Sequence, residues 1–158
     1  MTRIQDMTAT QRQSWVTLLA DGAVFIWFWR KMTTGFSPFP NQYDIGEFGV
    51  IIVGMIILTI ILHVIIAIVF EITGRNAGDG KDERDIAIER RGSTWGYRMY
   101  QIGVGVITVG VLMSAGFGAE YLSPLRFDTP VQIIFGLVVT SYVADLTKHA
   151  VMILGYGR

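Results

Sequence analysis

The sequence contains no cysteine, only two histidines and equal numbers of acidic and basic residues. The absence of cysteine excludes disulfide bonds, thiolate metal sites and catalytic thiols. Because the formal net charge is zero, nothing in the overall electrostatics favours a nucleic-acid partner, and none is predicted.

Motifs of the common enzyme classes are also missing. The chain has no Gly-x-Ser-x-Gly elbow, no His-Glu-x-x-His helix and no phosphate-binding glycine loop. The run GVGVITVG, residues 103–110, is rich in glycine, but it lies inside an apolar segment with no strand before it. We therefore predict no catalytic residue and no metal site, and we favour a role without enzymatic activity.

Long apolar runs dominate the sequence. Hydrophobic residues make up 51% of the chain and the mean hydropathy is positive. The clearest run, FGVIIVGMIILTIILHVIIAIVF, can cross ~30 Å of hydrocarbon as a helix, and His63 is its sole ionisable residue. We predict an all-α fold in one transmembrane domain, residues 1–158, with a four-helix bundle whose spans are 15–31, 48–70, 99–118 and 130–154.

The first predicted span is the weakest, because it is short and contains Asp21. Trp27 and Trp29 are followed directly by Arg30 and Lys31, which resembles the aromatic and basic anchors found at membrane interfaces. A cleaved signal peptide is not favoured, since the apolar core lies far from Met1 and no small-residue cleavage pattern follows it. We therefore count this segment as a span.

The basic residues divide unequally between the two sides that four spans would create. The positive-inside rule places the side with more lysine and arginine in the cytoplasm, so both termini and the charged loop 71–98 are predicted to be cytoplasmic. That side carries Arg3, Arg12, Arg75, Lys81, Arg84, Arg90, Arg91, Arg98 and Arg158, whereas Arg30, Lys31 and Arg126 lie opposite.

The stretch KDERDIAIERRG concentrates charge at the predicted start of the third helix. A glycine-rich link, residues 73–80, precedes it, and no proline follows until Pro124, so the third helix is expected to extend from the membrane into the cytoplasm. Acids in the first turn favour the positive end of the helix dipole. The pattern fits an anchored, capped helix; alternatively it is a partner-docking surface made of Asp82, Asp85, Glu89, Arg84 and Arg91.

The run DERDIAIERRG, a following apolar span and the terminal GYGR resemble an uncharacterised family of small prokaryotic membrane proteins with an Asp-Glu-Arg-type loop motif. The resemblance covers about half of the chain, from Lys81 to the C-terminus. It implies four spans and an inner-membrane location in a prokaryote, and it implies no particular reaction.

Polar groups inside the predicted spans are the candidates for chemistry, because charges in hydrocarbon are costly and usually face a bundle interior or a cavity. Counted from the span ends at ~1.5 Å per residue, they all fall in the cytoplasmic half. We predict an intramembrane polar cluster of Asp21, His63, Gln101, Asp145, Lys148 and His149. A structural role stays open, since Asp145 can pair with Lys148 or His149 in its own helix.

Small residues recur every four positions near the end of the third span. Gly110, Ser114 and Gly118 follow the small-xxx-small pattern that allows membrane helices to approach closely. We predict that this stripe packs against a helix of the same chain or of a second copy.

Three functions are compatible with these features. The favoured one is a small inner-membrane accessory protein, a subunit or stabiliser of a larger assembly, with a second copy or another membrane protein as partner. The alternative is a small ion-coupled transporter or channel in which Asp21 or Asp145 titrates. The third is a redox protein that holds one haem between His63 and His149; no other cofactor is predicted.

Overall fold

The computed structural model describes residues 7–34, 40–77, 82–117 and 127–157. Within these ranges the chain is all-helical and contains no strand. Its four helices are α1 (Ala9–Met32), α2 (Ile45–Ala77), α3 (Glu83–Ser114) and α4 (Pro130–Tyr156).

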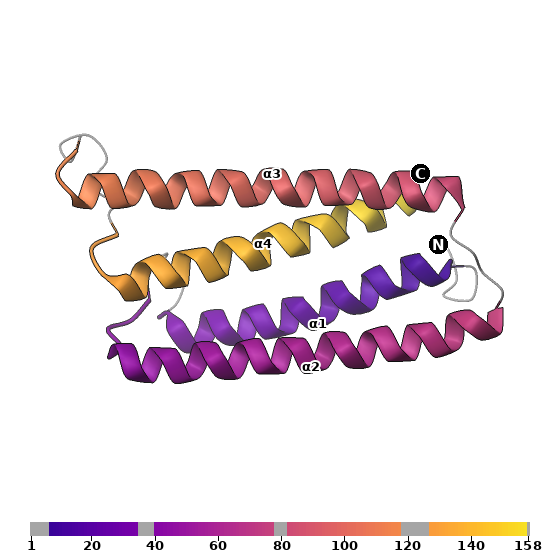
Figure 1. The fold of residues 1–158 in the computed structure, drawn as a ribbon, viewed down its shortest axis with the longest axis horizontal. Helices are drawn as coiled ribbons and strands as arrows, with labels where there is room; N and C mark the ends of the chain where they lie inside the picture. Colours follow the sequence, from indigo (N-terminus) through magenta and orange to yellow (C-terminus); the bar gives the residue numbers. More distant parts are fainter. Residues whose placement is uncertain (1–6, 35–39, 78–81, 118–126, 158) are drawn as a thin grey trace.

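The four helices lie in the order α3, α4, α1, α2 and alternate in direction (Figure 1). Helices α1 and α2 form one antiparallel hairpin, and α3 and α4 form another. The contact between α1 and α4 joins the two hairpins, while α2 touches α4 only lightly. Helices α2 and α3 therefore form the two edges, and α1 begins at the same end of the molecule at which α4 ends.

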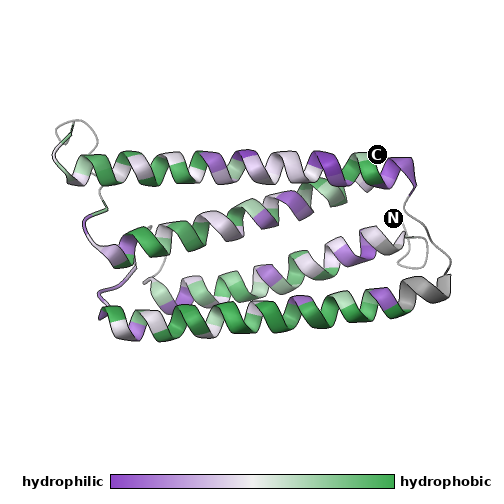
Figure 2. Cartoon of the chain, in the orientation of Figure 1, coloured by the Kyte–Doolittle hydropathy of each residue, from purple (hydrophilic) through white to green (hydrophobic). Residues whose placement is uncertain are grey.

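Two of the described helices are long and apolar enough to cross a membrane. They are α2, over Ile45–Ile72, and α4, over Pro130–Tyr156. Figure 2 shows α2 as hydrophobic along most of its length, whereas α3 is hydrophilic over much of its first half. Only 11% of the most apolar stretch of α2 is buried by the rest of the chain. The exposed surface of α2 thus needs a non-aqueous environment or a partner.

Local signals explain where the helices begin. Thr129 caps α4 with its side chain and forms a capping box with Gln132, and Pro130 occupies the first turn. Asp82 caps α3, where its carboxylate accepts a hydrogen bond from the Asp85 backbone N–H at 2.7 Å. The link expected at residues 73–80 is shorter than predicted, because α2 continues to Ala77; its remainder, 78–80, lies outside the described residues.

Helix α1 buries a single stripe of residues with a spacing of three and four. A seven-residue repeat of this kind keeps the same side of a helix in contact with its neighbours. One half of the stripe is polar and the other half is apolar. The buried members are Ser14, Thr17, Asp21, Val24 and Phe28. Asp21 is therefore part of the packing seam of α1.

The apolar half of this seam leads into a hydrophobic core at one end of the molecule. Phe28 of α1 stacks on Phe135 of α4 with ring centroids 5.6 Å apart, and Trp29 packs beside Phe135. Phe48 and Met55 of α2 complete the same cluster. This core lies toward the end of α1 and the start of α2, away from the start of α1 and the end of α4.

Glycines allow α3 and α4 to approach closely. A Cβ atom added at Gly96 would lie 2.9 Å from the Ala144 carbonyl oxygen, and one added at Gly92 would lie 2.9 Å from the Lys148 carbonyl oxygen. Both distances are too short for a real carbon–oxygen contact, so only glycine fits there. The pair Gly92 and Gly96 is itself a GxxxG motif, hidden in sequence by the charged residues around it.

The stripe predicted from the sequence lies further along α3. Gly110 is buried, and its carbonyl oxygen accepts a hydrogen bond from the Phe127 N–H at 3.4 Å. Ser114 is partly buried and its hydroxyl donates to the Gly110 carbonyl of its own helix at 3.1 Å. Gly118 lies outside the described residues. Gly92 and Gly96 provide a close helix approach that the sequence did not lead us to predict, and the packing role of Gly110, Ser114 and Gly118 stays a prediction.

We expect Gly96→Leu to lower the free energy of unfolding by about 1–3 kcal/mol, because the new side chain meets the backbone of α4. Gly105→Ala on the same helix is the matched control, since a Cβ there has no neighbour within 4 Å. The control should leave stability unchanged or raise it by up to about 1 kcal/mol, as alanine is the better helix former. Detergent melting curves provide the measurement, and equal curves for Gly96→Leu and the parent chain would contradict the close approach.

Candidate functional site

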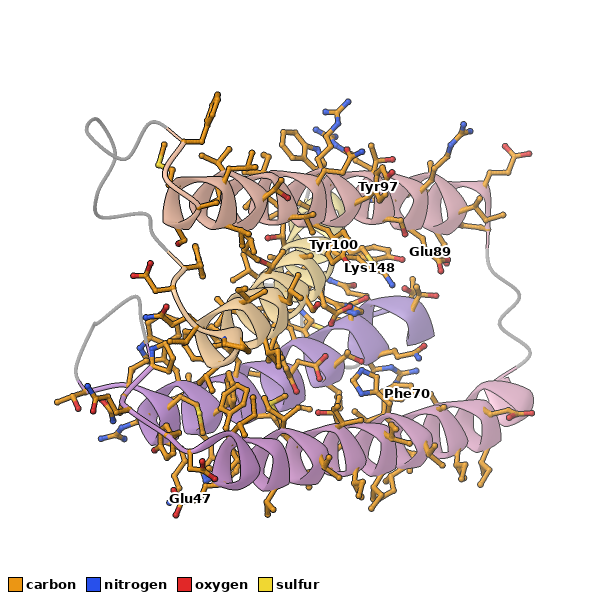
Figure 3. The ribbon with its side chains drawn as sticks, turned by 60° about the vertical axis from the view of Figure 1, so that its left-hand side comes forward. Glu47, Phe70, Glu89, Tyr97, Tyr100 and Lys148 are labelled. Atoms are coloured by element: carbon orange, nitrogen blue, oxygen red, sulfur yellow. The ribbon has the colours of Figure 1, made fainter. Side chains whose placement is uncertain are left out.

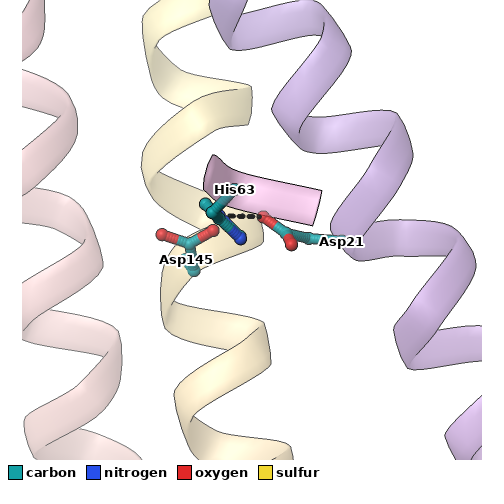
Figure 4. A group of neighbouring side chains, drawn as sticks. All are labelled: Asp21, His63 and Asp145. Carbon is teal, nitrogen blue, oxygen red and sulfur yellow. Dashed lines mark ion pairs between the residues drawn. The ribbon is translucent and has the colours of Figure 1, made fainter. Parts of the chain in front are cut away.

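Three ionisable side chains from three different helices meet near the middle of the molecule. Asp21 of α1, His63 of α2 and Asp145 of α4 each offer one oxygen or nitrogen atom, and these atoms all lie within 4.8 Å of one another. His63 Nε2 is 3.4 Å from Asp21 Oδ2 (Figure 4). We call this group the Asp21–His63–Asp145 cluster.

Asp21 is the most deeply buried member of the cluster. Its side chain is 3% exposed, because it lies on the packing seam of α1 between α2 and α4. Neither carboxylate oxygen has a hydrogen-bond partner among the residues that the structure describes. A buried carboxylate without hydrogen bonds is costly, so this position calls for a positively charged or proton-donating neighbour.

His63 faces Asp21 in a defined orientation. Its Nδ1 lies 2.9 Å from the Thr59 carbonyl oxygen, one turn earlier in α2. A carbonyl oxygen only accepts hydrogen bonds, so Nδ1 carries the proton in this contact. In the neutral ring Nε2 then presents a lone pair to the Asp21 carboxylate, and two acceptors face each other. A cation or an added proton between them removes this repulsion.

The cluster opens into a cavity between α2 and α4. The cavity has a volume of about 510 Å³ and is lined chiefly by apolar side chains, with the three cluster residues at one part of its wall. Thr59 and Tyr142 also line it, and their hydroxyls are 2.6 Å apart across the two helices. The side chains of His63 and Asp145 are 43% and 39% exposed, respectively, so the cavity gives access to the cluster.

The second histidine of the chain lies next to the cluster but outside the cavity. His149 Nε2 is 3.7 Å from Asp145 Oδ2, one turn along α4. His149 is not among the residues that line the cavity, whereas His63 is. The two imidazoles therefore do not flank a common cavity, and this arrangement does not favour a haem held between His63 and His149.

Two other predicted members of the cluster lie elsewhere. Gln101 is exposed on α3, which packs mainly against α4 and so does not reach the other polar groups. Lys148 lies on the side of α4 that faces α3 (Figure 3), where its Cβ is 3.1 Å from the position that a Cβ would take at Gly96. Of the six predicted residues, the structure brings Asp21, His63 and Asp145 into one group, with His149 beside them.

The residues of the predicted docking surface on α3 differ in their environments: some are buried or cap the helix, and others are exposed. Asp85 is 6% exposed and accepts a hydrogen bond from the Tyr156 hydroxyl at 2.5 Å, so it joins α3 to α4 and does not face a partner. Asp82 is the helix cap, and Glu89 is partly buried. Arg84 and Arg91 are exposed and line a shallow groove of about 410 Å³ with residues of α4.

Sequence reasoning missed the side chains that support the cluster. Thr59 and Tyr142 read as ordinary polar residues within apolar runs, and no metal-binding group was predicted. The available signal was spacing: Thr59 precedes His63 by four residues, so its carbonyl lies within reach of the imidazole. Tyr142 precedes Asp145 by three residues and so lies near the same face of α4.

Comparisons of the chain with protein-family models, curated proteins and solved structures found no match. The resemblance to a prokaryotic family therefore stays a prediction.

We expect Asp21→Asn to melt at the same temperature as the parent chain or at a higher one, in detergent and without added metal ions. The amide keeps the shape of the carboxyl group but cannot ionise, so it removes the cost of a buried charge. Asp85→Asn is the contrasting variant, because Asp85 accepts the Tyr156 hydrogen bond and should be the more sensitive position. A loss of several degrees in Asp21→Asn would indicate a structural role for the carboxylate.

Proposed function

We propose that this chain is a four-span membrane protein that passes a small cation through the Asp21–His63–Asp145 cluster. The observation that carries the proposal is the buried Asp21 carboxylate, which has no hydrogen-bond partner among the described residues and faces His63 at 3.4 Å. Ionisable groups inside a membrane bundle commonly mark the path of an ion. The role is that of an ion-coupled transporter or a channel.

Insertion of all four helices is supported by the packing of the two less apolar ones. Helix α1 lies between α2 and α4, which are the helices able to cross a membrane on their own. Its polar stripe of Ser14, Thr17 and Asp21 points into the molecule and away from the surface. The second half of α3 packs on α4, with Gly103 against Thr140. Both helices thus have a partner that covers their polar or small side chains.

The orientation that we propose places both termini and the start of α3 in the cytoplasm of a prokaryotic cell, with the chain in the inner membrane. Single cysteines at Thr2, Gly80 and Leu122 test it cleanly, because the chain has no other cysteine. An impermeant maleimide should label position 122 in intact spheroplasts, and positions 2 and 80 only after the membrane is opened. Labelling of position 80 in intact spheroplasts would reverse the proposed orientation.

The positions of the aromatic core and of the cluster along the helices support a route from the cytoplasmic side to the cluster. The aromatic core around Phe28 and Phe135 closes the far end of the molecule. The Thr59–Tyr142 hydrogen bond joins α2 to α4 between that core and the cluster. A cation can therefore reach the cluster without crossing the aromatic core, and its further passage requires that core to open.

Reconstituted liposomes provide the test of cation passage. With trapped indicators for protons, sodium and manganese, the parent chain should dissipate at least one of the three gradients. Asp21→Asn and Asp145→Asn should slow that flux at least tenfold, because each removes a carboxylate from the route. Asp44→Asn is the matched control, since Asp44 is an exposed carboxylate next to the first turn of α2.

Liposomes in which the parent chain dissipates no gradient, despite correct insertion, would leave the accessory role as the better proposal. That second candidate is favoured by the groove lined by Arg84 and Arg91, which suits an acidic segment of a partner protein. The exposed apolar surface of α2 offers a second contact for a membrane partner or another copy of the chain.

A further inference from the structure

The donor atoms of the cluster are placed as a metal site would need them. A tetrahedral metal ion with bonds of about 2.1 Å holds neighbouring ligand atoms about 3.4 Å apart. His63 Nε2 and Asp21 Oδ2 are separated by 3.4 Å. Asp145 contributes an oxygen within 4.8 Å of a ligand atom of each of the other two residues, and its side chain is 39% exposed.

The orientation of His63 matches that of a metal ligand. Histidines that bind metals donate their second ring N–H to a carbonyl or carboxylate, which fixes the tautomer and directs the free lone pair to the ion. Thr59 supplies that carbonyl at 2.9 Å from Nδ1. The Nε2 lone pair is thereby directed at the same space as the Asp21 carboxylate.

Charge and donor type narrow the class of ion. Two carboxylates and one neutral imidazole carry two negative charges, which a divalent cation balances, and charge balance matters most in a site as buried as Asp21. Calcium and magnesium prefer oxygen ligands only, and copper(I) prefers sulfur. A mixed nitrogen and oxygen set suits zinc, manganese, iron(II) and cobalt.

We propose that the Asp21–His63–Asp145 cluster binds a divalent transition-metal ion through one carboxylate oxygen of each aspartate and Nε2 of His63. The proposal deepens the proposed function, on which it rests, by naming the class of cation. The remaining coordination position faces the cavity between α2 and α4, where a water molecule or a moving ligand has room. His149 lies 3.7 Å from Asp145 Oδ2 and is not itself one of the ligands.

The test uses the full chain in detergent, stripped with a chelator and titrated with Co²⁺, whose visible absorption bands report coordination number. The parent chain should bind one Co²⁺ per chain with the stronger bands of four-coordinate cobalt, and Zn²⁺ should displace it. Mg²⁺ in large excess should not. Asp21→Asn, His63→Gln and Asp145→Asn should each weaken binding at least tenfold, and Asp44→Asn should bind as the parent does.

Two variants separate a specific site from general chelation. His149→Gln removes the only other histidine in the chain and should weaken binding less than His63→Gln does. Asp21→Cys keeps a ligand of similar reach and should add a thiolate-to-cobalt charge-transfer band in the near ultraviolet, which no other residue of this cysteine-free chain can produce. Binding with equal affinity in the parent and His63→Gln, or no charge-transfer band in cobalt-loaded Asp21→Cys, would overturn the proposal.

The outcomes distinguish the metal proposal from cation passage. If the parent chain binds no transition metal but its proton or sodium flux depends on Asp21, the metal proposal fails and cation passage stands. If the cluster binds Co²⁺ through His63 but no gradient is dissipated, cation passage fails and the metal site stands.

Discussion

The seam between α1 and α4 is the contact that holds the molecule together. Each hairpin packs internally, but among the four described helices only this seam joins the two hairpins extensively. Its buried residues are apolar at one end, with Phe28 and Val24, and polar at the other, with Asp21 and Thr17. The same contact therefore supplies apolar packing and a buried polar region. Because Asp21 is fixed within this contact, the cluster has a rigid member, and His63 and Asp145 on the flanking helices are the more exposed ones.

The burial of Asp21 lowers the stability of the folded chain. The Asp21 side chain is almost fully withdrawn from solvent, which weakens the folded state whenever the group is ionised without a partner. The aromatic core nearby supplies apolar burial that offsets this cost. Proteins commonly tolerate such local destabilisation where a group must bind something. The Thr59 carbonyl orients His63, and His149 lies 3.7 Å from Asp145, so both of the more exposed members have a polar neighbour in their own helix.

The helices were predictable from local signals, whereas the contacts between helices were not. The apolar runs indicated four helices, and Thr129 with Pro130 marked the start of α4, because such signals act within a few residues. Counting from the span ends placed Asp21, His63 and Asp145 at one depth. Counting could not show that α3 lies at an edge, which separates Gln101 from the others, or that Tyr156 reaches back to bury Asp85. Gly92 and Gly96 were overlooked because charged neighbours made that stretch look solvated.

The division into two hairpins also bears on the order in which the cluster is assembled. In each hairpin the less apolar helix is synthesised first and the more apolar helix second, as α1 before α2 and α3 before α4. The first hairpin already holds Asp21 and His63, and Asp145 joins them only when α4 packs against α1. The cluster is therefore complete only once the two hairpins have docked, so its geometry reports whether the last contact of the fold has formed.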